Sequence, residues 1–187
     1  MKDLSDKGAV CYRRYLNGDE SAVDDIMREL FFSLVCFVEH YVHDMSAAED
    51  IAMDVMSDLF LNKHRYNFKV SLKTYVFMRG KSRALDLIRH RKALPVFSYE
   101  DAASYGDELF DLEDRLVSDE RKRAVHGAIE KLPEEMREAV YLIYFEELSY
   151  ADASRVMGKK PKQIDNLLYR AKKELRSILG EEGKELL

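Results

Sequence analysis

The side chains best suited to chemistry lie near the carboxyl end of the sequence, where cations, amides and a phenol recur at helical spacing. At about 100° per residue, the segment 161–179 gathers its apolar residues on one side, which predicts a helix with one buried face. The remaining surface offers groups that bind phosphates or reach base edges, and these candidates for DNA contact are Lys162, Gln163, Asn166, Tyr169, Arg170 and Lys173. A merely solvated amphipathic helix is the alternative interpretation.

Capping signals place this helix inside a helix-turn-helix. Ser149 and Asp152 have the spacing of a capping box at the start of a short helix, 150–157. Gly158 suits a left-handed helix end, and Pro161 suits the first position of the next helix. A short helix, a tight turn and a longer basic helix are typical of this motif, which favours the DNA-binding interpretation.

A second pattern is a row of carboxylates in the predicted helix 47–63. Asp50, Asp54 and Asp58 recur at i, i+4, so their like charges repel by roughly 0.2–0.5 kcal/mol per pair. We expect a partner to relieve this repulsion. A solvated acidic face is the alternative, and no metal site is expected because no His or Cys accompanies these carboxylates at ligand spacing.

Aromatic and basic residues are interleaved from the loop 65–71 into the predicted helix 72–92. Rings beside cations suit an unstacked single strand, because bases stack on the rings while cations meet phosphates. The candidates are Tyr66, Phe68, Lys69, Tyr75, Arg79 and Arg83. The alternative is that Tyr75, Val76 and Phe77 belong to the core, which we expect for at least one of them.

The elements that must position these residues are helices. The 187 residues are 47% apolar and include only 8 Gly and 3 Pro, a composition that predicts an all-α fold. Periodicity and capping predict helices at 6–16, 21–42, 47–63, 72–92, 118–132, 134–147, 150–157 and 161–179. The third of these is expected to begin with a capping box formed by Ser46 and Glu49.

An acidic stretch divides the chain. Nine carboxylates and one cation lie between Glu100 and Glu120, whereas the cations predominate in 79–92 and 159–176. We therefore predict two small helical domains, 1–95 and 118–187, joined by a flexible acidic linker, 96–117.

The cysteines and the amino-terminal residues indicate in which cellular compartment the protein is expected. Cys11 and Cys36 cannot form a disulfide framework, and reduced thiols suit a reducing cytoplasm. The apolar run that contains Cys36 is too short to span a bilayer, and residues 1–3 lack the charge pattern of a signal peptide. We expect a cytoplasmic protein without membrane insertion.

Taken in order, the motifs resemble those of the extracytoplasmic-function (ECF) sigma factors of bacterial RNA polymerase, which belong to the sigma-70 family. The similarity to region 4 of these proteins is carried by Leu132–Val140, Leu148–Ala153 and Ile164–Leu175. The similarity to region 2 is carried by Asn17–Ala22, Ala48–Ile51, Lys73–Phe77 and Arg83–Arg89.

The resemblance implies a transcription initiation factor that binds the clamp helices and flap of core RNA polymerase. Region 2 would open the minus-ten element and take a flipped base into a pocket, and region 4 would read the minus-thirty-five element. The clamp contact would fall on Glu49, Asp50 and Asp54. An anti-sigma partner is also implied.

Several positions depart from the family pattern, among them Arg79–Gly80, which stands where the family has an apolar-Ala pair. Ser82 stands where the family usually has Asn, and we count it among the candidates for DNA contact. Lys160 replaces a frequent capping Ser, a loss of about 1 kcal/mol that Pro161 partly offsets. Asp165 replaces a frequent cation, so promoter preference cannot be carried over. In the same helix as Ser82, Asp86 shares a stripe with Arg79, Arg83 and His90 and is expected to orient these cations rather than to contact DNA.

The main rival is a helix-turn-helix repressor or activator whose first half senses a ligand or dimerises. It would leave the acidic helix and the aromatic-basic helix without a purpose. An enzyme is not expected, because the sequence has no glycine-rich phosphate loop and no Cys–His pair at useful spacing. No cofactor is expected either.

Overall fold

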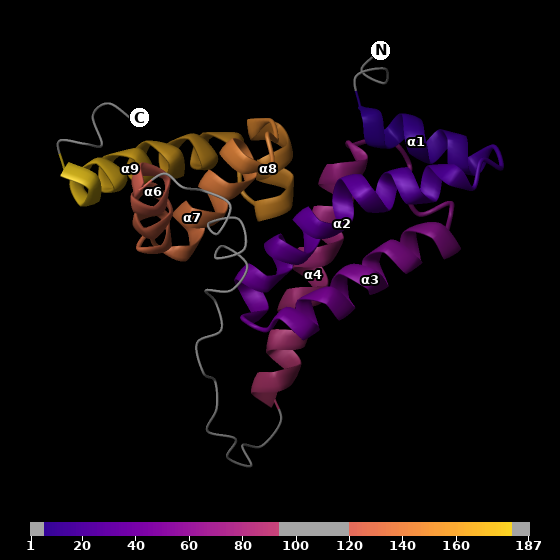
Figure 1. Ribbon diagram of the computed structural model, residues 1–187, viewed down its shortest axis with the longest axis horizontal. Helices are drawn as coiled ribbons and strands as arrows, with labels where there is room; N and C mark the ends of the chain where they lie inside the picture. Colours follow the sequence, from indigo (N-terminus) through magenta and orange to yellow (C-terminus); the bar gives the residue numbers. More distant parts are fainter. Residues whose placement is uncertain (1–5, 94–119, 181–187) are drawn as a thin grey trace. The chain divides into compact units, whose positions relative to one another are not determined.

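The computed structural model describes residues 6–93 and 120–180. Within these ranges the regular structure is helical and contains no strand, so the all-α prediction is confirmed. The contacts divide the chain into two compact units, Met1–Gly106 and Asp107–Leu187 (Figure 1). The predicted acidic linker, 96–117, lies outside the described residues. None of the helices in the described ranges has the length and apolar character needed to cross a bilayer.

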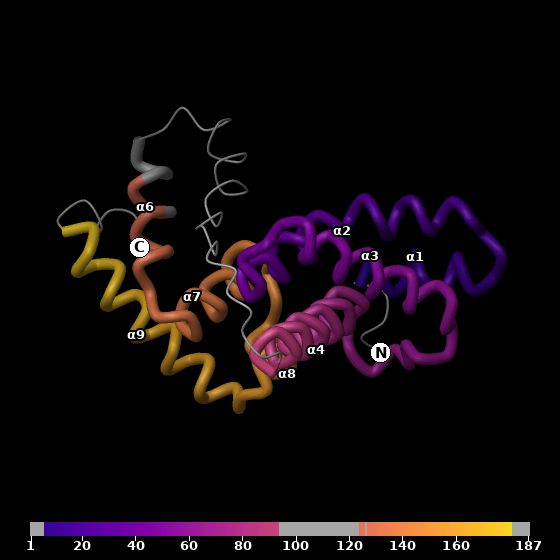
Figure 2. The backbone as a smooth tube through the Cα atoms, turned by 90° about the horizontal axis from the view of Figure 1, so that it is seen from below, coloured from indigo at the N-terminus to yellow at the C-terminus, as the bar shows by residue number. Residues whose placement is uncertain are grey.

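The amino-terminal unit is built from four helices: α1 (Lys7–Leu16), α2 (Ser21–Val42), α3 (Met45–Leu61) and α4 (Leu72–Ala93). The long α2 packs against each of the other three, and α3 also packs against α4 (Figures 1 and 2). Their apolar faces form one core, whose fully buried large side chains are Tyr12, Ile26, Leu34, Phe37, Val38, Met56, Leu59, Leu72, Val76 and Phe77.

The start of α3 differs from the prediction. The helix begins at Met45, and the N-cap is Asp44, whose carboxylate accepts a hydrogen bond from the Ala47 N–H at 3.1 Å. The expected capping box of Ser46 and Glu49 is therefore wrong. Asp44 takes the role because His43 ends α2 in the left-handed region with φ 50°, which leaves Asp44 extended and ready to cap.

One carboxylate caps two helices. Asp6 Oδ1 accepts the Ala9 N–H at 3.1 Å at the start of α1, and Asp6 Oδ2 accepts the Leu72 N–H at 3.0 Å at the start of α4. A negative charge at a helix N-terminus is also favoured by the helix dipole. The amino-terminal ends of α1 and α4 are therefore held at a single point.

Two tyrosines of α1 satisfy the carbonyl groups at the end of α3. The Tyr12 hydroxyl donates to the Leu59 carbonyl at 2.8 Å, and the Tyr15 hydroxyl donates to the Phe60 carbonyl at 2.9 Å. Burial, with smaller contributions from Tyr15 and Tyr75, raises the pKa of Tyr12 to about 12. Tyr12 therefore stays a neutral hydrogen-bond donor at physiological pH.

The carboxyl-terminal unit contains α6 (Glu120–Glu130), α7 (Glu134–Val140), α8 (Tyr150–Met157) and α9 (Pro161–Leu179). A π-helical turn, Tyr141–Phe145, follows α7 where the sequence predicts one continuous helix to residue 147. The helix α9 packs against α6, α7 and α8, and its buried side chains complete a small separate core.

Gly80 allows α4 to approach α2 closely. A Cβ atom at this position would lie 2.8 Å from Leu34 Cδ1 and 3.1 Å from Val38 Cγ2, and both of these side chains are fully buried. Glycine within a helix costs about 0.5–1 kcal/mol relative to alanine. Here the absence of a Cβ atom allows α4 to pack closely against α2. The packing fixes the position of α4, the helix that carries the candidate DNA-contacting arginines.

We predict that Gly80→Ala destabilises the amino-terminal unit by about 1–3 kcal/mol, because the added methyl group overpacks a filled core. Gly127→Ala in α6 is the matched control: its Cβ would meet no atom within 4 Å, and it should stabilise by about 0.5–1 kcal/mol. Urea unfolding monitored by circular dichroism measures both. An increase in stability for Gly80→Ala would contradict the close approach of α2 and α4.

Candidate nucleic-acid interface

The helix-turn-helix has the geometry that the capping signals predict. Ser149 accepts the Asp152 N–H at 3.1 Å and caps α8, and Gly158 ends α8 in the left-handed region with φ 66°. The predicted division of α9 into two faces is confirmed, because its buried residues are Ile164, Leu167, Leu168, Ala171 and Leu175. The opposite face is open to solvent.

The exposed face of α9 carries each predicted DNA-contacting residue of this helix. The Tyr169 ring is 73% exposed, and exposed cations flank it at Lys162 and Lys173. Asn166 and Arg170 are also exposed, which leaves an amide and a guanidinium available for a base edge. Asp165 is exposed as well, so a carboxylate is present at the same surface.

Gln163 has a structural role that sequence reasoning missed. Its side-chain oxygen accepts the backbone N–H of Lys160 at 2.8 Å. The amide thus satisfies a backbone group at the start of α9, where no hydroxyl cap is available. Gln163 therefore caps the amino-terminal end of α9. Its side-chain NH2 group is the part that would remain for a contact with a base.

A small recess of about 200 Å³ lies beside the exposed face of α9 and is lined by Glu135, Lys159, Gln163, Asn166, Leu167 and Arg170. Lys159 forms an ion pair with Glu135, with Nζ and Oε1 2.7 Å apart. Lys159 was not among the residues predicted to contact DNA, although it lies in the basic segment 159–176. The pairing places a further cation next to Asn166 and Arg170.

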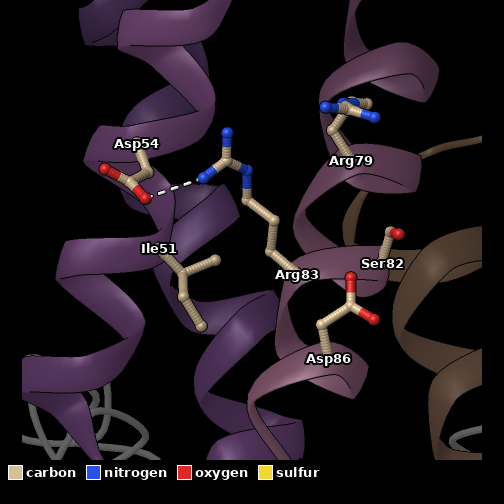
Figure 3. Close-up of a pocket in the computed structure, with 6 residues that line it drawn as sticks. All are labelled: Ile51, Asp54, Arg79, Ser82, Arg83 and Asp86. Carbon is tan, nitrogen blue, oxygen red and sulfur yellow. Dashed lines mark hydrogen bonds and ion pairs between the residues drawn. The ribbon is translucent and has the colours of Figure 1, made fainter. Parts of the chain in front are cut away.

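In the amino-terminal unit, the carboxylates of α3 face the arginines of α4. Arg83 donates to Asp54 at 2.7 Å, as Figure 3 shows, and Arg79 donates to Asp58 at 3.3 Å. The expected repulsion along α3 is therefore relieved within the chain itself at two of the three aspartates. The i, i+4 spacing of the acids could be read from the sequence, but the packing of the arginines of α4 against them could not.

The predicted clamp-contacting residues lie near the solvent-exposed surface of α3. Glu49 and Asp50 are exposed and form no ion pair within residues 6–93 or 120–180. Asp54 is 67% exposed even though it is paired with Arg83. Two of the three carboxylates thus remain free for an external cationic surface within the described parts of the chain, and the third is shared with Arg83.

A larger recess of about 440 Å³ lies between α3 and α4 (Figure 3). The arginines Arg79 and Arg83 and the hydroxyl of Ser82 line it on the α4 side, with Asp86 one turn further on. Asp86 pairs with Arg89 at 2.7 Å, so the expectation that it orients Arg79 and Arg83 is wrong. The i, i+3 pair within α4 competes successfully for this carboxylate.

The aromatic loop has fewer accessible rings than predicted. Tyr66 is only 3% exposed, its hydroxyl donates to the Val70 carbonyl at 2.8 Å, and its ring packs 4.6 Å from Phe68. Tyr66 is thus a core residue and presents no free face to a base. Val76 and Phe77 are fully buried, which confirms the core alternative for these two positions.

Phe68 and Tyr75 remain partly accessible above this buried ring. Phe68 has φ 59°, which is unusual for a residue with a bulky side chain, and the Arg13 guanidinium lies 5.0 Å from the centre of its ring. Tyr75 packs 5.2 Å from Tyr66 and is half-buried, while Lys69 is exposed. The loop and the start of α4 therefore offer one partly exposed ring each, together with the exposed Lys69, to a ligand.

The carboxyl-terminal unit is similar to a known protein family. A family model described as "Sigma-70, region 4" matches residues 122–175. The ECF RNA polymerase sigma factor SigM of Bacillus subtilis is 24% identical over 156 residues, covering 83% of this chain and 94% of the relative. The RNA polymerase sigma-H factor of Pseudomonas aeruginosa is 26% identical over 174 residues, covering 89% of this chain and 90% of the relative.

Two solved structures share the fold. CnrH in complex with the cytosolic domain of CnrY has a TM-score of 0.60 at 16% identity and covers 91% of this chain and 95% of its own. The sigma factor RpoE in complex with the anti-sigma factor NepR from Bartonella quintana has a TM-score of 0.58 at 21% identity. It covers 84% of this chain and 96% of its own.

A pH-dependent contact ties the ends of α3 and α4 together. The Ala47 N–H, and then the Arg91 guanidinium at 3.0 Å, hold the pKa of Asp44 below its ordinary value. A carboxyl group with a lowered pKa in the folded state stabilises the fold above its unfolded pKa. That stability is lost as the pH falls through the folded pKa, because the unfolded chain then binds the proton more readily.

We predict that the unfolding midpoint of the amino-terminal unit falls as the pH drops below the ordinary Asp value of 3.8. Asp44→Asn keeps a capping side chain but removes the charge, so it should lower stability at neutral pH and flatten the acid decline. Thermal unfolding between neutral and strongly acidic pH measures this. An equally steep decline in Asp44→Asn would show that other carboxyl groups cause it.

Proposed function

We propose that this chain is an ECF sigma factor of the sigma-70 family, to which its carboxyl-terminal unit and its relatives point, and that it binds core RNA polymerase and directs it to specific promoters. Residues 1–95 bind the polymerase and open the minus-ten element, residues 118–187 read the minus-thirty-five element, and residues 96–117 join them. The protein acts by binding rather than by catalysis, needs no cofactor, and works in the cytoplasm.

The observation that carries this proposal is the exposed face of α9. Asn166, Tyr169 and Arg170 lie between Lys162 and Lys173 on the exposed side of α9. The opposite side of the helix is buried in the core. Lysines make phosphate contacts that position a helix, and amide and guanidinium groups read base edges. Ser149 and Gly158 fix the preceding helix and turn, so the face is presented on a rigid support.

The recess between α3 and α4 supports a role with the minus-ten element. Arg79, Ser82 and Arg83 line it, and they supply two guanidinium groups and a hydroxyl for backbone or base contacts. Phe68, Lys69 and Tyr75 would add two partly exposed rings and a cation from the loop and the start of α4. Tyr66 supports the Phe68 ring from below instead of stacking on a base.

Polymerase binding falls on the exposed carboxylates of α3. Glu49, Asp50 and Asp54 present three negative charges within little more than one helical turn. A cationic surface on the clamp would complement them. The flap contact belongs to the carboxyl-terminal unit.

An anti-sigma protein completes the set of proposed partners. One similar structure holds a sigma factor bound to an anti-sigma factor, and the other holds CnrH bound to the cytosolic domain of CnrY. We propose that a protein of this class binds the present chain and competes with polymerase and promoter DNA. Its release would then control initiation.

Transcription with purified core polymerase tests the function. Core enzyme alone and core enzyme with this protein are compared on fragments of the source genome, and transcript ends are mapped. New start sites that appear only with the protein are the expected result. Duplex DNA binding without any effect on initiation would favour a repressor or activator instead.

The exposed face of α9 predicts two distinguishable effects on promoter selection. Asn166→Ala should relax selectivity at one position of the minus-thirty-five element, because a bidentate base contact contributes roughly 1–3 kcal/mol of discrimination. Lys173→Ala should weaken all promoters alike and lower the salt dependence by about one unit of slope. Competition among single-base promoter variants at several salt concentrations measures both. Equal losses on matched and mismatched promoters for both variants would make α9 a phosphate-binding surface only.

The Asp54–Arg83 pair predicts that polymerase binding and DNA binding are coupled. Each residue is proposed for a different partner, yet they contact each other at 2.7 Å. Asp54→Asn should therefore raise the affinity of the free protein for DNA, and Arg83→Gln should raise its affinity for core polymerase. An exposed ion pair contributes about 0.2–1 kcal/mol, so each gain should be up to about fivefold.

Controls separate this coupling from a simple change of net charge. Asp24→Asn and Lys7→Gln alter exposed residues that form no ion pair in the part of the chain that the structure describes, and they make the same charge changes. Fluorescence anisotropy with labelled DNA and with labelled core enzyme provides both affinities. Gains no larger than those of the two controls would rule out the coupling.

A further inference from the structure

Asp58 is a carboxylate of the amino-terminal unit that several side chains contact at once. Its side chain is only 14% exposed, and its two oxygens accept hydrogen bonds from three donors. Arg65 Nη1 lies 2.8 Å and 2.9 Å from the two oxygens, Asn62 Nδ2 lies 2.7 Å from Oδ1, and Arg79 Nη2 lies 3.3 Å from Oδ2. Such multiple charge-assisted bonds fix the positions of their donors.

The donors come from two different parts of the chain. Arg65 belongs to the loop between α3 and α4, which also carries Phe68 and Lys69, and Arg79 belongs to α4. In Figure 3, Arg79 lies on the same stretch of α4 as Ser82 and Arg83 and lines the same recess. Asp58 therefore connects the loop to the helix through their cations.

The cluster keeps a surplus of positive charge. One carboxylate faces two guanidinium groups, and Arg65 and Arg79 are still 55% and 39% exposed. Both arginines can thus bind Asp58 from one side and leave donors for an anion on the other, since a guanidinium carries five N–H groups. Burial raises the pKa of Asp58, but hydrogen bonding to Arg65, the charge of Arg65 and further contacts lower it more, so the net shift is downward.

We propose that Asp58 is a positioning residue for minus-ten recognition, which holds Arg65 and Arg79 so that loop and helix present one preformed surface to the unpaired strand. The inference rests on the proposed function of the chain. Free arginine side chains have many rotamers, and a ligand that must order them binds less tightly. Asp58 orders them before DNA arrives.

Simple electrostatics predicts the opposite result from positioning. Removal of a carboxylate makes the surface more positive, which by itself strengthens binding to any nucleic acid. Removal of a positioning group instead lowers the preference for the correct strand. The ratio of affinities for matched and scrambled strands therefore separates the two roles.

The experiment uses holoenzyme assembled from purified core polymerase. Two labelled single strands are compared: the non-template strand around the minus-ten element of a promoter that the wild-type holoenzyme opens, and a scrambled version. Asp58→Asn should lower the ratio of the two affinities by about threefold or more while scrambled-strand binding stays equal or rises. Asp58→Glu, which retains the carboxylate, should recover part of the ratio.

Arg65→Gln provides a second variant with the opposite charge change. It removes a cation, so scrambled-strand binding should fall, yet the ratio should fall as it does in Asp58→Asn. Asp24→Asn, which matches the charge change of Asp58→Asn on an exposed residue of α2, should leave the ratio unchanged. Arg65→Gln also serves if Asp58→Asn does not fold.

Two results would overturn the inference. An unchanged ratio in both Asp58→Asn and Arg65→Gln would mean that the cluster does not shape recognition. If Asp58→Asn lowered the ratio but also lowered both the affinity for core polymerase and the thermal stability, Asp58 would only maintain the fold. Failure of the wild-type protein to start transcription is a separate outcome that refutes the proposed function itself.

Discussion

The contact between α3 and α4 is the constraint on which the amino-terminal unit depends. Both helices are long and both pack on α2, so their polar faces meet along a shared edge. Carboxylates from α3 and guanidinium groups from α4 neutralise one another there at 2.7 Å and 3.3 Å. The close approach at Gly80 keeps α4 against α2 and thereby keeps the two rows of charge in reach of each other.

The same contact shows how a chain with a net charge of −5 can keep a local group of cations in place. The carboxylates of α3 lie opposite the arginines of α4, and the ion pairs between them hold the arginine side chains in fixed positions. In the carboxyl-terminal unit the arrangement is simpler, because the cations of α9 share one exposed face and need little support from elsewhere. The surfaces proposed for DNA contact therefore depend on local fields more than on the total charge of the chain.

Most of the helices could be predicted from the sequence because local signals determine them. The apolar spacing in α9, the Ser149 cap and the Gly158 stop act over a few residues, and each is found as predicted. The start of α3, the burial of Tyr66 and the partner of Asp86 could not be predicted. At the start of α3 and at Asp86, several nearby polar groups could fill the same role, and the sequence does not say which one does. Tyr66 is buried because its ring packs against Tyr12 and Phe68, a contact that is visible only in three dimensions.

The double cap at Asp6 has a consequence for synthesis on the ribosome. The bond to Leu72 joins residues 66 positions apart, so the first carboxylate of the described chain receives its second donor only after α1, α2 and α3 have been made. Until then, the apolar faces that α4 will cover stay open to solvent. Long-range closure of this sort slows folding and exposes nascent chains to aggregation. The emergence of α4 from the ribosomal tunnel therefore marks the moment at which the amino-terminal unit can close.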